Sequence, residues 1–324
     1  MSNENKTVVF HADNISKSFN AGKHLKVAVK NASFDIYDGD FVSIVGSSGC
    51  GKSVLAKMML GLYPPTSGEF TYYGKPIANT KKHWNEVQSI FQDPFSCFNQ
   101  FFSIRTQLED ARYILNPRPS KAEFAERVDA GLRAVNMEPN EIREKYPFEL
   151  SGGQRQRVMI AMAIANNPRI LIADEPTTAL DVTIQAQILE LMQDLQKKLG
   201  MAVILVTHDL GVIAEMADYV VVMYAGRVVE KGLAKEVFLD PRHPYTIGLM
   251  ESKPVINKKV DRLYSIPGAV PNPVNMPDYC YFRDRCEKCV ERCQGKYPPE
   301  IHVSETHIVS CWRYFDDPNR GGNE

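Results

Sequence analysis

The feature that most constrains this chain is a glycine-rich loop at residues 46–53. Its sequence, Gly46-Ser-Ser-Gly-Cys-Gly-Lys52-Ser53, fits the pattern G-x-x-x-x-G-K-[ST] at every fixed position. Residues 41–45 before it are rich in strand-forming types, and residues 53–62 after it predict a helix that ends before two prolines. A strand, a glycine-rich loop and a helix in this order predict a phosphate-binding loop in an α/β fold.

The chemistry of the loop follows from its residue types. Glycines let backbone N–H groups approach phosphate oxygens, and the N-terminus of the following helix adds a favourable dipole. We expect Lys52 to reach the β- and γ-phosphates of a nucleotide and the Ser53 hydroxyl to coordinate Mg²⁺. Cys50 stands where the pattern accepts any residue, and we interpret it as filler. The candidate nucleotide-binding residues here are Gly46, Ser47, Ser48, Gly49, Cys50, Gly51, Lys52, Ser53 and Val54.

A second candidate site lies at Asp174 and Glu175, directly after the apolar run of residues 170–173. A carboxylate at the end of a buried parallel strand, beside a phosphate loop, provides a further protein ligand for Mg²⁺. We assign that role to Asp174, together with Ser53. Glu175, one residue later, is available to orient and deprotonate water, as a general base does.

Strand and helix patterns alternate in the second half of this region. Residues 170–173, 203–207 and 219–223 predict short buried strands, and residues 184–198 and 210–217 predict helices between them. Alternation of this kind favours a largely parallel sheet in an α/β fold.

Residues 94–165 are mainly helical by pattern, and Ser120 with Glu123 forms a capping box within them. The apolar residues that then share one helical face are Phe124, Val128, Leu132 and Val135. After residue 240, frequent prolines break any long element. We therefore predict a domain of residues 1–240, with a helical subdomain at about 94–165, and an irregular extension of residues 241–324.

Composition excludes several classes of protein. The 324 residues include 38 Lys and Arg against 39 Asp and Glu, so a strongly basic nucleic-acid-binding protein is not expected. The longest apolar run, residues 158–165, is far shorter than the about 20 residues of a membrane-spanning helix. The first ten residues lack a basic start followed by an apolar core, so we expect no signal peptide and a reducing, cytoplasmic location.

Three further patterns complete a resemblance. Leu150-Ser-Gly-Gly-Gln154 precedes a predicted helix, Gln92 lies in Phe91-Gln-Asp-Pro94, and His208 follows the strand at residues 203–207. With the phosphate loop and Asp174-Glu175, these patterns resemble the nucleotide-binding subunits of ABC transporters over residues 7–240. The resemblance implies a RecA-like, mostly parallel core with an antiparallel β subdomain and a helical subdomain.

The resemblance also implies roles for individual residues. Glu175, His208 and Gln92 would be catalytic, and Gln92 would also contact Mg²⁺ beside Ser53 and Asp174. Asp181, in Ala179-Leu-Asp181, would belong to the D-loop, and Phe19 would stack on adenine. The signature residues, which act on the nucleotide of a partner chain, would be Ser151, Gly152, Gly153 and Gln154.

In that family, two ATPase chains enclose two nucleotides, and ATP hydrolysis to ADP and phosphate reopens the pair. The resemblance therefore implies a second ATPase subunit, which is a paralogue or another copy of this chain. It also implies two transmembrane permease subunits and an extracellular substrate-binding protein. The chain itself would lie at the cytoplasmic face of the membrane, and no nucleic acid partner is expected.

A second resemblance concerns the residues after 240. His243-Pro-Tyr-Thr246, Pro267-Gly and Pro271-Asn-Pro, followed by cysteines, resemble the C-terminal extension of oligopeptide/dipeptide-importer ATPases. Importers of that relationship also carry oligosaccharides and nickel. In that extension the cysteines resemble a [4Fe–4S] site; zinc suits four thiolates equally well, and thiols without a metal are the third alternative. The matching cysteines are Cys280, Cys286, Cys293 and Cys311, with Cys289 as an alternate ligand.

Two other functions remain open from the sequence. One is a soluble ABC ATPase that acts on ribosomes or in DNA repair, and the other is an iron–sulfur regulator that uses ATP only as a signal. The single phosphate loop, and the presence of both Glu175 and His208, favour a transport ATPase over either alternative. The cargo, whether oligopeptide, dipeptide, oligosaccharide or nickel, is not specified by this chain.

Overall fold

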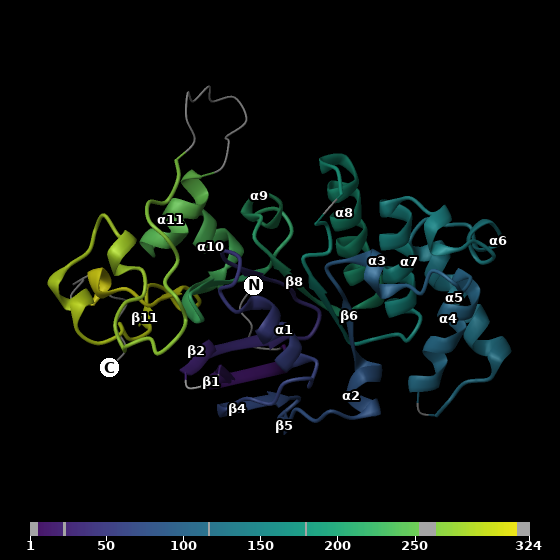
Figure 1. Ribbon diagram of the computed structural model, residues 1–324, viewed down its shortest axis with the longest axis horizontal. Helices are drawn as coiled ribbons and strands as arrows, with labels where there is room; N and C mark the ends of the chain where they lie inside the picture. The colour runs from purple at the N-terminus through teal and green to yellow at the C-terminus, as the bar shows by residue number, and fades with distance from the viewer. Residues whose placement is uncertain (1–5, 22–23, 116, 179, 253–263, 316–324) are drawn as a thin grey trace.

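The computed structural model describes residues 6–21, 24–115, 117–178, 180–252 and 264–315 (Figure 1). Ala179 of the D-loop pattern and the first five residues, on which the signal-peptide expectation rests, lie outside the described residues. In the part of the chain that is described, none of the helices is long and apolar enough to cross a membrane.

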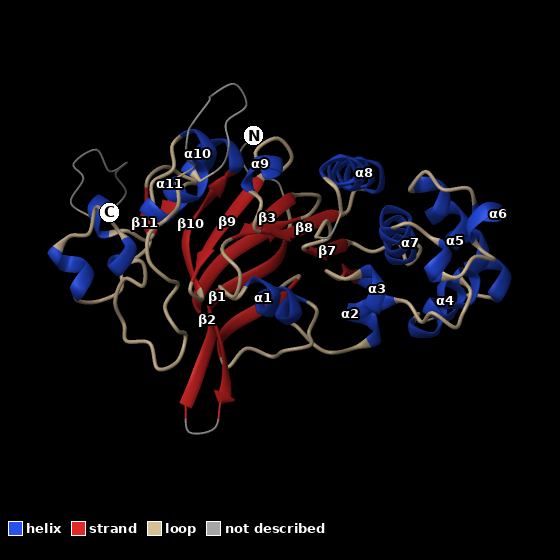
Figure 2. Ribbon diagram, turned by 45° about the horizontal axis from the view of Figure 1, so that its top comes forward, coloured by secondary structure: helices blue, strands red, loops and turns tan. Residues whose placement is uncertain are grey.

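An eight-stranded sheet lies at the centre of the molecule, in the order β11-β12-β10-β9-β3-β8-β7-β6 (Figure 2). Its strands are β3 (Phe41–Val45), β6 (Val87–Ile90), β7 (Ile170–Asp174), β8 (Ala202–Thr207), β9 (Tyr219–Tyr224), β10 (Arg227–Leu233), β11 (Ile301–His302) and β12 (Ile308–Val309). The strands β6, β7, β8, β3 and β9 pair in parallel, so the predicted parallel sheet is confirmed for them. The antiparallel pairs of β10 with β9 and β12, and of β11 with β12, make the whole sheet mixed.

The parallel strands are buried on both faces, which explains their nearly continuous apolar sequences. Successive residues enter different cores: Ile44 packs in one apolar cluster with Val206, whereas Val45 packs in another with Leu205. The first cluster lies on the side of α1 (Lys52–Met59), and the second lies on the side of α7 (Gly152–Ile164) and α8 (Val182–Leu199). This two-sided burial holds the carboxyl ends of the strands, where the candidate site lies, in a rigid frame.

A smaller antiparallel sheet has the order β2-β1-β4-β5. Its strands are β1 (Val8–Ala21), β2 (His24–Tyr37), β4 (Ser67–Tyr72) and β5 (Lys75–Pro76). Phe10, Ile36 and Phe70 from this sheet share an apolar core with α1 and one face of the large sheet. The expected antiparallel β subdomain is therefore present.

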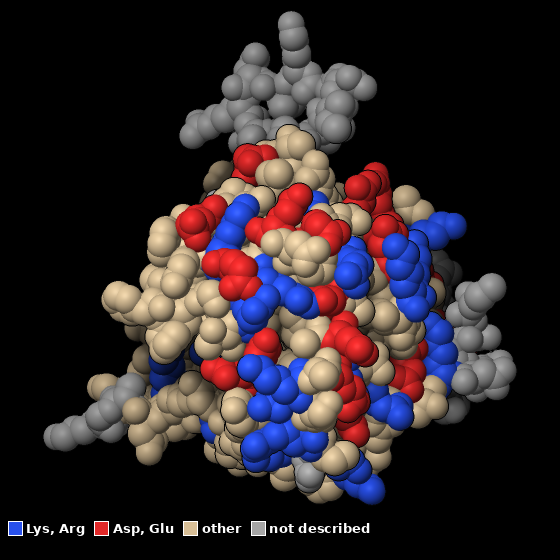
Figure 3. All heavy atoms as spheres, turned by 90° about the vertical axis from the view of Figure 1, so that its right-hand side faces the viewer, with Lys and Arg blue, Asp and Glu red and all other residues tan. Residues whose placement is uncertain are grey.

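The described residues of the segment 94–165 form helices and turns, and their assignment to a helical subdomain stays a prediction. The elements of this segment are α3 (Pro94–Cys97), α4 (Ile104–Asp110), α5 (Lys121–Ala134), α6 (Pro139–Ile142), α7 (Gly152–Ile164) and the 3₁₀ turns η2 (Ala111–Ile114) and η3 (Pro147–Glu149), with α2 (Lys81–Glu86) preceding β6. Ser120 caps α5 by accepting a hydrogen bond from the Glu123 backbone N–H, and the four apolar residues predicted to share a face are buried. Basic and acidic side chains lie among one another over this end of the molecule (Figure 3).

The remaining helices are α8 (Val182–Leu199), α9 (Leu210–Ile213), α10 (Ala234–Leu239) and α11 (Pro244–Glu251), with the 3₁₀ turns η4 (Arg283–Arg285), η5 (Glu291–Gln294) and η6 (Trp312–Tyr314). Helix α9 is shorter than the predicted 210–217 because the chain continues in a turn, in which the Ile213 carbonyl accepts hydrogen bonds from the N–H groups of both Met216 and Ala217. In the extension, Pro244 begins α11, a position where its missing N–H and fixed φ are tolerated. The boundary near residue 240 stays a prediction.

Candidate active site

The phosphate loop connects β3 to α1 and turns its lysine inward. Gly51 precedes α1 with φ 106, and a Cβ atom there would lie 2.2 Å from the Ala28 carbonyl oxygen, so glycine is required. The Lys52 side chain is buried, and its Nζ donates to the carbonyl oxygens of Gly46 at 2.8 Å and Ser47 at 3.2 Å. The ammonium is therefore held over the concave side of the loop, where phosphate oxygens are expected.

Ser53 and Asp174 meet across two elements. The Ser53 hydroxyl, in the first turn of α1, donates to Asp174 Oδ1 at 3.1 Å at the end of β7. Burial raises the pKa of Asp174, and the hydrogen bond from Ser53 opposes that shift. A hydroxyl and a carboxylate are hard oxygen ligands, so this pair fits the expected Mg²⁺ site in its donor chemistry.

Glu175 is the point where the strand-end loops converge. Its Oε2 accepts hydrogen bonds from Gln92 Nε2 at 3.1 Å and from the Thr178 hydroxyl at 3.2 Å. Its Oε1 lies 3.3 Å from His208 Nδ1 and 3.9 Å from Lys52 Nζ. Loops that follow β3, β6, β7 and β8 thus bring one carboxylate, one lysine, one glutamine and one histidine together. Thr178, which the sequence analysis missed, is three residues after Glu175 in a turn, and this spacing was its only signal.

The signature residues lie elsewhere in the chain. The Ser151 hydroxyl accepts from the Gln154 N–H at 3.2 Å, and the Gln154 side chain accepts from the Ser151 N–H at 3.0 Å, which forms a capping box at the start of α7. A Cβ atom on Gly153 would lie 2.8 Å from Ile184 Cγ2, so this glycine lets α7 approach α8. In Figure 1, α7 lies among the helices at the right, away from α1 and the phosphate loop. The structure therefore does not bring the signature to the chain's own lysine.

The other predicted residues have structural surroundings of their own. Asp181 caps α8 by accepting from the Ile184 N–H at 2.9 Å. Phe19, on β1, packs edge-on against Tyr63 with ring centroids 5.4 Å apart, and Lys17 Nζ lies over both rings. Tyr63, which the sequence analysis missed, is thus a second aromatic ring beside the position expected for adenine.

Within the loop, Ser48 and Gly49 are exposed, and Cys50 is buried. Burial raises the pKa of the Cys50 thiol. Val54, in the first turn of α1, packs partly buried against the core. These contacts agree with the interpretation of Cys50 as filler, because its side chain faces the protein rather than the concave side of the loop.

The cysteines of the extension are all free thiols, and Cys280, Cys293 and Cys311 are buried. The pKa of Cys280 is raised to about 12 and that of Cys311 to about 11, mainly by burial and in smaller part by the proximity of Cys286 and Cys293. The four expected ligands therefore lie within electrostatic reach of one another. Among the described residues, however, no three or more His, Cys, Asp or Glu side chains form a group that could hold a metal ion. The expected metal-binding extension is thus not supported by the structure, because the thiols gather without forming a ligand set.

Comparison with known proteins decides the family. Residues 29–178 match the model of the family described as ABC transporter, and residues 229–293 match the one described as oligopeptide/dipeptide transporter, C-terminal region. The oligopeptide transport ATP-binding protein OppF of Haemophilus influenzae is 40% identical over 94% of this chain and 94% of its own length. The chain belongs to the ABC transporter family. The dipeptide transport ATP-binding protein DppD of Bacillus subtilis is 41% identical to this chain over 94% of each protein. This chain therefore belongs to the oligopeptide/dipeptide branch of the family.

Solved structures agree with this assignment. The ABC transporter component cbiO1 of Clostridium perfringens superposes with a TM-score of 0.65 at 30% identity, over 72% of this chain and 92% of its own. An ATP-binding cassette solved as a dimer with ADP and phosphate superposes with a TM-score of 0.61 at 29% identity, over 70% of this chain and 99% of its own. The expected ABC ATPase fold, and an ATPase activity coupled to transport, are confirmed for this ABC subunit. Neither the soluble ATPase nor the iron–sulfur regulator is favoured.

Proposed function

We propose that this ABC subunit hydrolyses ATP to power the import of oligopeptides or dipeptides, or of a related cargo such as an oligosaccharide or nickel. The match of residues 229–293 to the oligopeptide/dipeptide transporter extension supports the peptide cargo. The names of the relatives, oligopeptide and dipeptide transport proteins, support it as well. Partner permeases, a substrate-binding protein and a second ATPase subunit complete the proposed importer, with this chain at the cytoplasmic face of the membrane.

The observation that carries the proposed chemistry is the convergence of side chains on the Glu175 carboxylate. A water molecule that attacks the γ-phosphorus of ATP must lose a proton, and Glu175 is the carboxylate available to accept it. Gln92 and His208, within 3.3 Å of that carboxylate, orient it and the water. Lys52 neutralises charge on the β- and γ-phosphates as the bond to the leaving ADP breaks. Bound Mg²⁺ at Ser53 and Asp174 would neutralise the phosphates further.

The test is Glu175→Gln, which keeps the size and the hydrogen-bonding reach of the side chain but cannot accept the proton. ATP turnover should fall about 10²- to 10⁴-fold, the usual contribution of a general base, while ATP binding is retained. Glu190→Gln is the matched control, because Glu190 is exposed on α8. Turnover within threefold of the unaltered protein would remove Glu175 from the role of base.

We also propose that Ser151 acts on the nucleotide of a partner chain, supported by the place of α7, which Ser151 caps, away from α1 in Figure 1. Mixed dimers test this with Lys52→Ala and Ser151→Arg. Each nucleotide site would consist of the phosphate loop of one chain and the signature of the other. With one substitution in each chain, both defects therefore fall in the same site, and the other site still encloses a nucleotide. With both substitutions in one chain, each site carries a defect. Equal nucleotide trapping by the two arrangements would contradict the proposal.

Cargo is tested in the complex reconstituted with its permeases and binding protein. Oligopeptides or dipeptides should stimulate ATP hydrolysis, whereas oligosaccharides and nickel should not. Stimulation by nickel or an oligosaccharide alone would reject the peptide cargo and leave the ATPase proposal intact.

We propose further that Cys280, Cys286, Cys293 and Cys311 take up a [4Fe–4S] cluster, with zinc as the alternative, after ligation draws them together. The support is that these thiols lie close enough to one another to interact electrostatically, and ligation would release their protons. Anaerobic preparations should contain about four iron and four acid-labile sulfide per chain. A Ser substitution at any of the four should remove them, whereas Cys289→Ser and Cys97→Ser should not. Stoichiometric zinc without iron would identify the alternative, and neither metal would reject the site.

A further inference from the structure

A tyrosine of the C-terminal extension directly contacts the phosphate loop. The Tyr245 hydroxyl, on α11, accepts a hydrogen bond of 2.7 Å from the backbone N–H of Ser47, although the two residues are 198 positions apart. Tyr245 is 1% exposed, so water does not compete for this hydrogen bond. Burial raises the pKa of Tyr245 to about 12, which keeps its hydroxyl uncharged at neutral pH.

The same Ser47 residue is held from its other side. Its carbonyl oxygen accepts a hydrogen bond from Lys52 Nζ at 3.2 Å. The extension thus fixes the N–H of Ser47, and the lysine of the loop contacts its C=O. A movement of Ser47 would therefore displace an anchor of the ammonium group that is expected to bind phosphate.

Helix α11 is anchored firmly enough to transmit this constraint. His243 caps the helix, with Nδ1 accepting from the Tyr245 N–H at 3.0 Å. The fully buried Glu230 side chain accepts from the His243 N–H at 2.9 Å and lies 2.7 Å from His307 Nε2. Because Glu230 lies on β10, the start of α11 is fixed to the central sheet.

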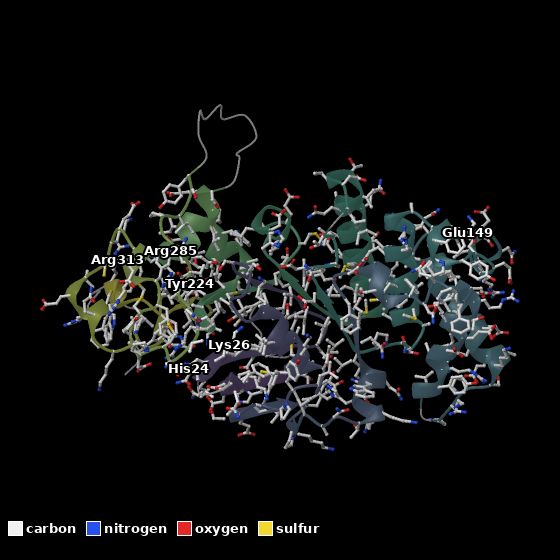
Figure 4. All side chains as sticks on the ribbon, in the orientation of Figure 1. His24, Lys26, Glu149, Tyr224, Arg285 and Arg313 are labelled. Atoms are coloured by element: carbon white, nitrogen blue, oxygen red, sulfur yellow. The ribbon has the colours of Figure 1, made fainter. Side chains whose placement is uncertain are left out.

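The ring of Tyr245 packs against the cysteine-bearing segment. Its centroid lies 4.6 Å from that of Tyr224 and 5.6 Å from that of Phe282, which stands between Cys280 and Cys286 in the sequence. Arg285 donates to the Tyr224 hydroxyl at 3.3 Å, and Figure 4 shows these two residues beside each other at the junction with the extension. The packing of the extension thus sets the position of the ring whose hydroxyl holds Ser47.

We infer that Tyr245 is a positioning residue for ATP binding, through which the packing of the C-terminal extension sets the geometry of the phosphate loop. This inference rests on the proposed ATP site. Ser47 stands at the start of the loop, so its hydrogen bond to Tyr245 organises the loop before the nucleotide arrives. Organisation in advance lowers the free-energy cost of binding and leaves the chemical step unchanged.

The test is Tyr245→Phe, which removes the hydroxyl and keeps the buried ring. The KM for ATP and the dissociation constant for ATP should each rise about 3- to 10-fold, the effect of one hydrogen bond, while kcat stays within twofold. Tyr73→Phe is the matched control, because that tyrosine hydroxyl donates to Asp38 Oδ1 at 2.6 Å, away from both the phosphate loop and α11. Its KM should equal that of the unaltered chain.

Phe282→Leu provides a second route to the same effect, because it loosens the support of the Tyr245 ring without altering the hydroxyl. Its KM for ATP should also rise, and this arm tests the inference even if Tyr245→Phe fails to fold. An unaltered chain that binds no ATP would reject the proposed function itself. If the unaltered chain binds ATP, an unchanged KM in the folded variants, or a lower kcat with an unchanged KM, would overturn the positioning role.

Discussion

His243 makes the free energy of unfolding of this ABC subunit depend on pH, and the size of the effect can be calculated. Its ring is buried, and burial lowers its pKa from 6.5 to about 4, with Glu230 opposing that shift. In the unfolded chain the ring regains its ordinary pKa, so the unfolded state binds more protons between pH 6.5 and 4. The free energy of unfolding must therefore fall as the pH falls through that window. A difference of about 2.5 pKa units corresponds to about 3 kcal/mol in all, of which about 2 kcal/mol is lost by pH 5.

The substitution that isolates this effect is His243→Asn. Asparagine supplies an oxygen acceptor for the cap of α11 but does not titrate. Urea unfolding at pH 7 and pH 5 should show that the unaltered chain loses about 2 kcal/mol more stability than the variant. Glu230 and His307 face the same buried space, but they are present in both proteins, so their contribution largely cancels in the difference. Equal losses in the two proteins would refute the reasoning.

Three further substitutions test the site. Lys52→Ala should weaken ATP binding at least about 10-fold, measured by calorimetry, because it leaves phosphate charge unneutralised in a partly desolvated loop. Gly51→Ala should also abolish tight ATP binding, because the added Cβ would lie 2.2 Å from the Ala28 carbonyl oxygen; Gly295→Ala, where the nearest atom is at 3.6 Å, is its control. Ser151→Ala should lower the free energy of unfolding by about 1 kcal/mol through loss of the α7 cap, and an unchanged denaturation midpoint would contradict that.

The parts of the site that were predictable from the sequence depend on local spacing. The phosphate loop, the Asp174-Glu175 pair and His208 each lie at the end of a short apolar strand, and the alternation of strands and helices predicts that these ends share one edge. The meeting of Glu175 with Lys52, Gln92 and His208 follows from that topology. The individual distances do not, because they depend on how the strands pack on both faces of the sheet.

Contacts between distant segments were not predictable in the same way. Strands β11 and β12 are two residues each, too short for any period-two pattern, and only the pairing of β12 with β10 and of β11 with β12 identifies them as strands. The contact of Tyr245 with Ser47 was missed although His243-Pro-Tyr-Thr246 had been recognised as a pattern. A pattern that starts a helix predicts the local structure but does not indicate which surface the helix packs against.

The edge of the central sheet explains why the extension is not a separate appendage. Strand β10 would present unpaired backbone groups at its outer side, and β12 covers them by pairing Glu230 with Val309. The buried side chain of Glu230 then accepts from the His243 N–H, and the same helix carries Tyr245 to the phosphate loop. Residues after 300 and residues near 240 therefore meet at one buried carboxylate, which contacts both His307 and His243. Glu230→Gln should consequently weaken ATP binding in the same direction as Tyr245→Phe, because both substitutions act on the anchoring of α11. Unchanged ATP affinity in a folded Glu230→Gln variant would show that the anchor and the loop are independent.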